Sequence, residues 1–134
     1  MKILDTDVCV EVLRGNEHVI ARRLETREEI ATTWVTASEL FYGAAKSKDP
    51  DGNAALVTAF LATLPTLSPD LAASRLFGEV KTHLQARGES LADADLFIAS
   101  IALAHDATLV TGNRRHYERI PGVVIEDWIR GPGG

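Results

Sequence analysis

The chain has 134 residues, of which 46% are apolar and 25% are charged, and this size and composition suit a single globular domain over residues 1–134. Its formal net charge of −5 argues against a protein that coats nucleic acids, because non-specific binding to a polyanion depends on neutralising its phosphates. One cysteine, no basic leader and no apolar run of about 20 residues favour a soluble, reduced protein of the cytoplasm with no membrane contact.

Short apolar or β-branched runs alternate with longer segments of helical periodicity. Residues 46–53, Lys-Ser-Lys-Asp-Pro-Asp-Gly-Asn, predict a loop, and Ser68-Pro69 predicts a helix start with proline at the first helical position. In chain order, the pattern predicts a strand over residues 2–5, helices over 7–14 and 17–27, a strand over 30–35, helices over 36–45 and 54–64, a short strand over 66–67, helices over 68–88 and 93–105, and strands over 107–110 and 123–125.

This alternation of strands and helices predicts an α/β fold with a mainly parallel sheet covered by helices on both faces. The segment 93–105 is apolar nearly all round, which favours a helix buried against that sheet. In such folds ligands bind beyond the carboxyl ends of the strands. The residues that follow each strand are therefore the candidates for a functional site.

Acidic and other polar residues, together with one glycine, are predicted at this edge from four separate parts of the sequence. Such convergence is typical of a functional site and is not expected of polar residues scattered over a surface. The residues are Asp5 and Asp7 after the first strand, Thr36, Ser38 and Glu39 after the second, Asp93 and Asp95 at the start of the buried helix, and Thr111, Gly112 and Asn113 after the strand over 107–110.

Three of these acids also have structural explanations. Asp5 ends a buried strand, where an unpaired carboxylate is costly to desolvate, and this favours a functional role. Asp7 is equally well placed to cap the next helix or to serve a site. Thr36-Ala37-Ser38-Glu39 matches a capping box, in which Glu39 bonds back to the start of its own helix. Glu39 is favoured as a site residue only because other acids are predicted at the same edge of the sheet.

Helix geometry separates the two acids of the segment 93–105. Residues two apart differ by about 200° around a helix, so Asp93 and Asp95 cannot point the same way. Asp95 is assigned to the site, while Asp93 is the better N-cap and an accessory acid at most. Asn113 fits a turn, but it also offers an oxygen to a metal or an amide to a phosphate. Arg114 and Arg115 beside it are candidates for holding a phosphodiester.

The chemistry of the candidate residues favours a divalent cation. Carboxylates held close together repel one another unless a positive charge lies among them. Oxygen ligands suit Mg²⁺ or Mn²⁺, whereas zinc sites use Cys and His, and His105 and His116 have no metal-ligand spacing and are interpreted as surface groups. One or two such ions can activate water and stabilise the leaving oxygen in phosphodiester hydrolysis.

Four segments in order resemble the PIN-domain ribonucleases, specifically the VapC toxins of bacterial toxin–antitoxin pairs. The similarity extends over essentially the whole chain, including the closing Glu126-Asp127-Trp128. The segments are Ile3-Leu4-Asp5-Thr6-Asp7, the stretch from Val35 to Ala44 that contains Thr36-Ala37-Ser38-Glu39, Asp95-Leu96-Phe97-Ile98-Ala99, and Leu109-Val110-Thr111-Gly112-Asn113 running into His116-Tyr117-Glu118-Arg119-Ile120-Pro121-Gly122-Val123.

The resemblance implies a three-layer α/β/α fold, cleavage of RNA such as tRNA or rRNA with Mg²⁺ or Mn²⁺, and a homodimer. It also implies inhibition by a small VapB-type antitoxin that lays a peptide across a groove, for which Leu13, Phe41 or Tyr42 are candidate contacts. Carried over by position, the metal-binding acids are Asp5, Glu39 and Asp95. The fourth position of the family, frequently Asp, is Asn113 here, which weakens the case for a second tightly held ion. Asp7, Asp93 and Thr111 remain accessory candidates.

Two other functions compete with this one. Asp5-Thr6-Asp7 after an apolar strand resembles the nucleophile motif of haloacid-dehalogenase phosphatases, but no convincing phosphate-binding lysine accompanies it, and Asp93 and Asp95 open a helix instead. A PIN-like binding module that has lost catalysis is the non-enzymatic alternative. Asn113 is the residue that keeps this alternative open.

Overall fold

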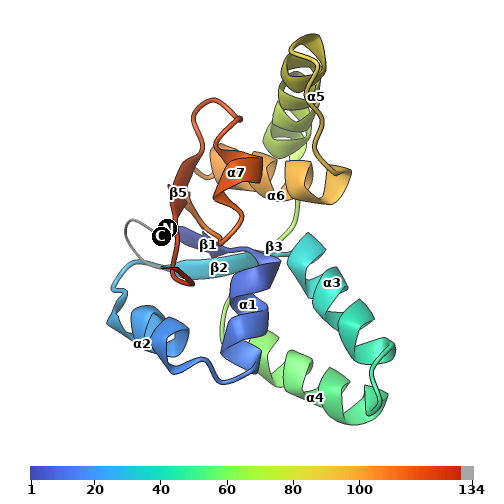
Figure 1. Cartoon of the computed structure of the whole chain (residues 1–134), viewed down its shortest axis with the longest axis vertical. Coiled ribbons are helices and arrows are strands. Elements are labelled where there is room, and N and C mark those ends of the chain that lie inside the picture. The colour runs from blue at the N-terminus through green and yellow to red at the C-terminus, as the bar shows by residue number, and fades with distance from the viewer. Residues whose placement is uncertain (131–134) are drawn as a thin grey trace.

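The computed structural model describes residues 1–130, in which five strands form one parallel sheet. The strand order is β3-β2-β1-β4-β5, so β1 lies at the centre (Figure 1). The strands are β1 (Lys2–Leu4), β2 (Ile30–Thr33), β3 (Thr66–Leu67), β4 (Thr108–Val110) and β5 (Val124–Glu126).

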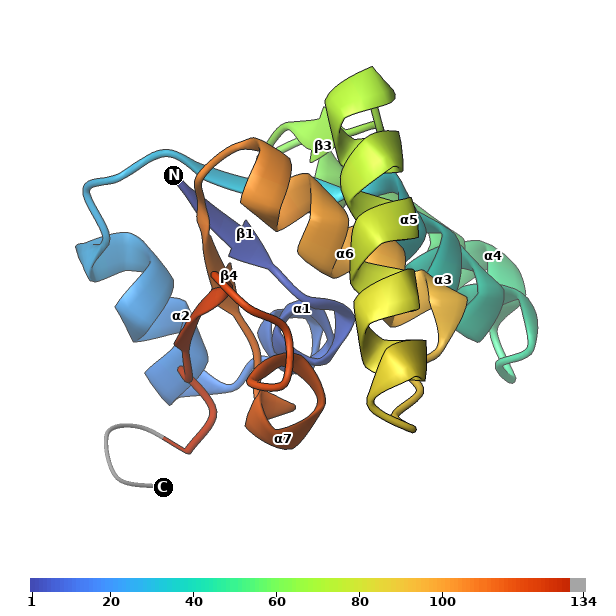
Figure 2. The same ribbon diagram turned by 90° about the horizontal axis from the view of Figure 1, so that it is seen from above.

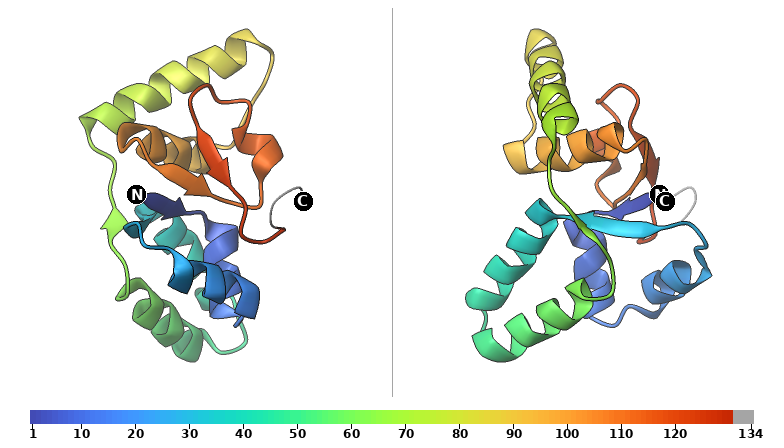
Figure 3. Two further views of the ribbon diagram at one scale, coloured as in Figure 1. Left: turned by 90° about the vertical axis from the view of Figure 1, so that its left-hand side faces the viewer. Right: turned by 180° about the vertical axis from the view of Figure 1, so that it is seen from behind.

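Helices cover both faces of the sheet, as the views from the side and from behind show (Figure 3). Helices α1 to α4 lie on one side, and α5, α6 and α7 lie on the other, with α5 packed across α6 (Figure 2). This arrangement confirms the predicted three-layer α/β/α fold. The helices are α1 (Thr6–Leu13), α2 (Glu17–Glu25), α3 (Trp34–Ala45), α4 (Pro50–Leu61), α5 (Leu71–Ala86), α6 (Asp93–Ala104) and α7 (Arg114–Tyr117).

The sheet separates two hydrophobic cores because successive side chains of a strand point to opposite faces. In β1, Ile3 joins the core under α5 and α6, whereas Leu4 joins the core under α1 to α4. In β4, Leu109 joins the core under α5 and α6, and Val110 joins the core under α1 to α4. The central strands are therefore apolar on both faces, which explains their short, unbroken apolar sequences.

The predicted start of α3 was wrong. Strand β2 ends at Thr33, and the helix begins at Trp34 rather than at Thr36. The Thr33 hydroxyl accepts a hydrogen bond from the Thr36 backbone N–H at 3.2 Å, which makes Thr33 the N-cap. Trp34 and Val35 are β-branched or aromatic types that favour strands, but the threonine cap before them decides the boundary. The capping box proposed for Thr36 and Glu39 is therefore absent.

Two further helices begin at aspartates instead of the predicted residues. Helix α4 starts at Pro50 because Asp49 accepts a hydrogen bond from Gly52 N at 3.1 Å, so the predicted loop over 46–53 is shorter. Helix α5 starts at Leu71 because Asp70 accepts from Ala73 N at 2.8 Å, and Ser68-Pro69 precede it. Helix α7 was not predicted, and the remaining elements agree with the prediction to within two residues at each end.

No helix within residues 1–130 is long and apolar enough to cross a membrane.

Candidate functional site

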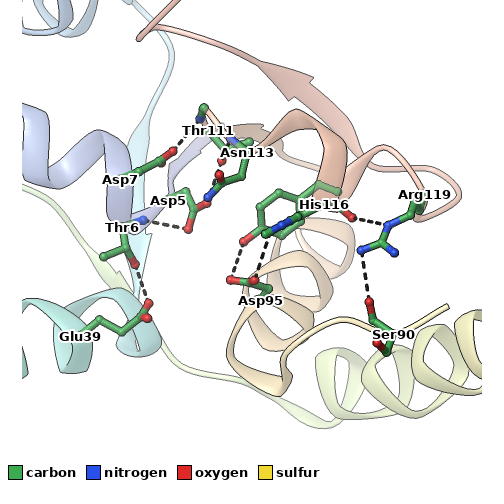
Figure 4. Close-up of polar contacts among 12 residues, drawn as sticks. Asp5, Thr6, Asp7, Glu39, Ser90, Asp95, Thr111, Asn113, His116 and Arg119 are labelled. Atoms are coloured by element: carbon green, nitrogen blue, oxygen red, sulfur yellow. Dashed lines mark hydrogen bonds and ion pairs between the residues drawn. The ribbon is translucent and has the colours of Figure 1, made fainter.

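Asp5 lies at the centre of the carboxyl edge of the sheet, directly after β1 (Figure 4). Its side chain is 3% exposed. One carboxylate oxygen accepts a hydrogen bond from Thr6 N at 2.8 Å, and the other accepts from the Thr111 hydroxyl at 2.8 Å. Asp5, rather than Asp7, is the residue that caps α1. The side chain is thus fixed between the start of α1 and the end of β4.

The pKa of Asp5 is raised from its ordinary value of 3.8 to about 7. Burial is the largest cause, followed by the negative charge of Asp7, and Asp95 makes a smaller contribution in the same direction. The hydrogen bonds from Thr111 and Thr6 oppose this rise only in part. A cation close to Asp5 would relieve this unfavourable concentration of negative charge.

Asp7 connects α1 to the loop that follows β4. One of its oxygens accepts from Val8 N at 2.8 Å, and the other accepts from Gly112 N at 2.9 Å. A Cβ atom added to Gly112 would lie 2.9 Å from that Asp7 oxygen and 3.0 Å from the Ile129 side chain, so a larger residue here would displace one of these side chains. Burial is the main reason that the pKa of Asp7 is raised. Asp7 therefore positions the segment that carries Asn113.

Glu39 approaches the same edge from α3 (Figure 4). The Thr6 hydroxyl donates a hydrogen bond to Glu39 Oε1 at 2.7 Å and lies 3.0 Å from the Thr36 hydroxyl. Glu39 therefore bonds to the start of α1 and not to the start of its own helix. Thr6 was not considered from the sequence, although its place between two candidate acids was the available signal.

Asp95 and Asp93 face different surroundings, as helix geometry predicts. Asp95 accepts a hydrogen bond from the Tyr117 hydroxyl at 3.2 Å, and His116 Nδ1 lies 3.7 Å from its other oxygen (Figure 4). Asp93 is 61% exposed and pairs with Lys81 at 3.0 Å. The prediction that Asp93 caps α6 was wrong, because Ala92 occupies the cap position without a side-chain hydrogen bond.

His116 was interpreted as an isolated surface group, and its contact with Asp95 corrects that interpretation. Tyr117 was not singled out at all. Both belong to α7, a helix of four residues with no periodic signal in the sequence. Burial, followed by the charges of Asp5 and Asp95, raises the pKa of the Tyr117 hydroxyl, which keeps that group protonated as a donor.

Thr111 and Asn113 complete the edge. Thr111 is buried, donates to Asp5, and accepts a hydrogen bond from Asn113 N at 3.0 Å. The Asn113 side chain is exposed and makes no capping bond to α7. Thr111 was an accessory candidate from the sequence, and the structure gives its hydroxyl a direct hydrogen bond to Asp5.

Two hollows of different chemistry adjoin the site. The first, of about 600 Å³, is bordered by cationic side chains, and it is lined by Gly112, Asn113, Arg114, Arg115, His116, Glu118, Asp127 and Arg130. The second, of about 380 Å³, is mainly apolar and has Thr6 and Glu39 at its border, with Val10, Leu13, Arg14, Leu40, Gly43, Ala44, Asn53, Leu56 and Val57 as the other lining residues. Leu13 belongs to the second hollow, whereas Phe41 and Tyr42 do not.

Comparison with known proteins identifies the family to which these residues belong. A sequence profile of the PIN domain matches residues 2–122. The chain is 35% identical over 127 residues to the tRNA(fMet)-specific endonuclease VapC of Salmonella typhimurium and 33% identical over 129 residues to Ribonuclease VapC2 of Rickettsia felis, with 94% of this chain and 96% of each relative covered. The chain belongs to the PIN-domain family.

Within that family the PIN domain described here groups with the VapC ribonucleases, which confirms the resemblance drawn from the sequence motifs. A DNA-bound VapBC structure from Salmonella typhimurium superposes with a TM-score of 0.88 at 36% identity, covering 95% of this chain and 97% of the matched chain. Family membership over most of the chain argues against the phosphatase alternative based on Asp5-Thr6-Asp7.

The acids of this PIN domain suit a divalent cation in their chemistry but are not gathered into a closed ligand set. Within residues 1–130, no three His, Cys, Asp or Glu side chains lie together in a group that could hold an ion. Glu39 is turned to Thr6, and Asp95 is turned to Tyr117. Carboxylate oxygens are the ligands that Mg²⁺ prefers, and the pKa of Asp5 is raised by burial and, to a lesser degree, by the negative charge of Asp7. Asp5, Glu39 and Asp95 supply the oxygen donors that such an ion takes, so their chemistry fits it.

Proposed function

We propose that this PIN domain is a metal-dependent endoribonuclease that acts as the toxin of a VapBC-type toxin–antitoxin pair. The observation that carries the proposal is the buried carboxylate of Asp5, whose pKa is raised to about 7 with Asp7 and Asp95 among the causes. Burial and neighbouring charge destabilise the ionised form of Asp5, and a bound Mg²⁺, or Mn²⁺ as a substitute, would offset this destabilisation. The names of the VapC relatives support hydrolysis of RNA.

Each residue has a distinct role in this proposal. Asp5, Glu39 and Asp95 hold the cation, which supplies Lewis-acid chemistry for phosphodiester hydrolysis when it is bound. The Thr111 hydroxyl fixes Asp5, and the Thr6 hydroxyl fixes Glu39, so that little side-chain ordering remains for the reaction step.

The cationic hollow beside Asn113 receives the RNA backbone. Arg114 and Arg115 are exposed on its border, and a guanidinium can bind two phosphate oxygens at once. The exposed Asn113 amide orients a phosphate or the attacking water. These local cations, together with the metal ion, offset the net charge of −5 that otherwise repels RNA.

The proposal also includes partners, which the names of the relatives and the hollows beside the site support. The substrate is RNA, with tRNA or rRNA as the expected classes, since the Salmonella typhimurium relative carries the name of a tRNA(fMet)-specific endonuclease. A VapB-type antitoxin binds the apolar hollow that contains Leu13 and ends at Glu39, which would cover the site. Assembly as a homodimer and a cytoplasmic location complete the proposal.

Cleavage of purified tRNA and rRNA by the isolated protein tests this function. We expect discrete RNA fragments with Mg²⁺ or Mn²⁺ and none after chelation with EDTA, with activity restored when Mg²⁺ is added back. Equal cleavage with and without EDTA would contradict a metal-dependent mechanism. Mapping the new RNA ends identifies the substrate and the cleavage site.

A binding module that has lost catalysis is the second candidate, favoured by Asn113 in place of an acid and by the ungathered carboxylates. Calorimetric titration with Mn²⁺ separates the two functions. The nuclease is expected to bind Mn²⁺ with an affinity that Asp5→Ala removes. A module without catalysis should show no Mn²⁺ affinity that depends on Asp5.

A further inference from the structure

Tyr117 is a buried tyrosine whose hydroxyl points to the site. Its side chain is 0% exposed and belongs to the core beneath α5 and α6. A phenylalanine would fill the same core volume, and burying a hydroxyl costs free energy unless it finds a hydrogen-bond partner. The partner is Asp95 Oδ1, at 3.2 Å. The hydroxyl therefore serves Asp95 in a way that core packing does not require.

This hydrogen bond restricts the Asp95 carboxylate. With Oδ1 held by Tyr117, rotation of the carboxylate group is limited, and Oδ2 keeps a defined position with His116 Nδ1 3.7 Å away. That separation is longer than a hydrogen bond, so Oδ2 remains available to another partner. Asp95 lies in the first turn of α6, and Tyr117 is the last residue of α7, so the bond also joins two elements of the site.

We propose that Tyr117 is a positioning residue that orients Asp95 for binding a divalent cation. This inference rests on the proposed function, because it assigns a purpose to a residue beside one of the expected metal ligands. Groups that hydrogen-bond to metal-ligating carboxylates typically contribute 10- to 100-fold to metal affinity. Tyr117 contributes through Asp95 and makes no contact with the RNA or the cation itself.

Tyr117→Phe tests this role because it removes one oxygen atom and keeps the ring. Tyr42→Phe is the matched control, since Tyr42 is the other tyrosine of the chain and is 66% exposed on α3. Calorimetric titration of the whole chain with Mn²⁺ should give a dissociation constant for Tyr117→Phe about 10-fold or more above that of the wild type. Tyr42→Phe should match the wild type.

Thermal melting in EDTA and in Mn²⁺ separates positioning from core stability. We expect Tyr117→Phe to melt close to the wild type in EDTA, while the increase in melting temperature produced by Mn²⁺ becomes smaller. A Tyr117→Phe variant that melts earlier in EDTA but keeps the full Mn²⁺-induced increase and an unchanged dissociation constant overturns the proposal. Wild-type protein that binds no Mn²⁺ overturns the proposed nuclease function as well, so the two failures are distinguishable.

Discussion

Asp5 shows how a residue of the site stores unfavourable free energy. Its carboxylate has two hydrogen-bond donors, yet its pKa is raised from 3.8 to about 7 by burial and neighbouring charge. Between about pH 4 and 7 the folded chain therefore holds a proton that the unfolded chain has released. Stability falls as the pH rises through this range and stays reduced above pH 7. This direction is opposite to that of a carboxylate stabilised by an ion pair.

Asp5→Asn should raise the melting temperature of the metal-free protein at pH 8 and leave it nearly unchanged at pH 4. The amide stays neutral at both values, and the Thr111 hydroxyl can accept a hydrogen bond from it. One pKa unit corresponds to about 1.4 kcal/mol, so we expect an increase of at least about 5 °C at pH 8. Melting curves in EDTA measure it, with Asp51→Asn, an exposed acid on α4, as the control. A lower melting temperature for Asp5→Asn at pH 8 would be incompatible with this electrostatic explanation.

The start of α3 determines where Glu39 points. Because Thr33 is the N-cap, Glu39 lies in the second turn and bonds to Thr6 on α1. Had Thr36 been the cap, Glu39 would have bonded to its own helix. The sequence located the helix and its acid but not the cap, because three threonines, Thr32, Thr33 and Thr36, offer hydroxyls within five residues. Tertiary contacts select among them.

Thr33→Ala should lower the free energy of unfolding by about 1 kcal/mol, the usual cost of losing a threonine cap. Ser38→Ala is the comparison, because the Ser38 hydroxyl is exposed and only bonds back to Trp34 O within the same helix. Urea denaturation of both variants measures the difference. An equal loss for Thr33→Ala and Ser38→Ala would contradict the assignment of Thr33 as the cap.

At the scale of the whole molecule, the sheet order brings the site together. Strands β2, β1 and β4 are neighbours, so the residues after each of them meet at one edge. Asp95 reaches this edge because a helix that crosses between parallel strands runs antiparallel to them and begins at their carboxyl ends. These general rules explain why Asp5, Glu39, Asp95 and Asn113 could be selected from the sequence.

The partners of those residues could not be predicted in the same way. The bond between Tyr117 and Asp95 depends on how a four-residue helix packs against α6, for which the sequence has no periodic pattern. The ion pair of Asp93 with Lys81 and the contact of His116 with Asp95 likewise depend on side-chain packing. Spacing and strand order thus predict which backbone positions converge, whereas tertiary packing decides the hydrogen bonds.

Asp93 and Asp95 offer the most direct test of the central claim, because they lie in one turn of α6 but only Asp95 faces the site. The measurement is the rate of RNA cleavage in Mg²⁺ by Asp95→Asn and by Asp93→Asn. We predict that Asp95→Asn cleaves no faster than the wild type in EDTA, while Asp93→Asn retains the wild-type rate. A wild-type rate for Asp95→Asn would show that Asp95 does not serve catalysis.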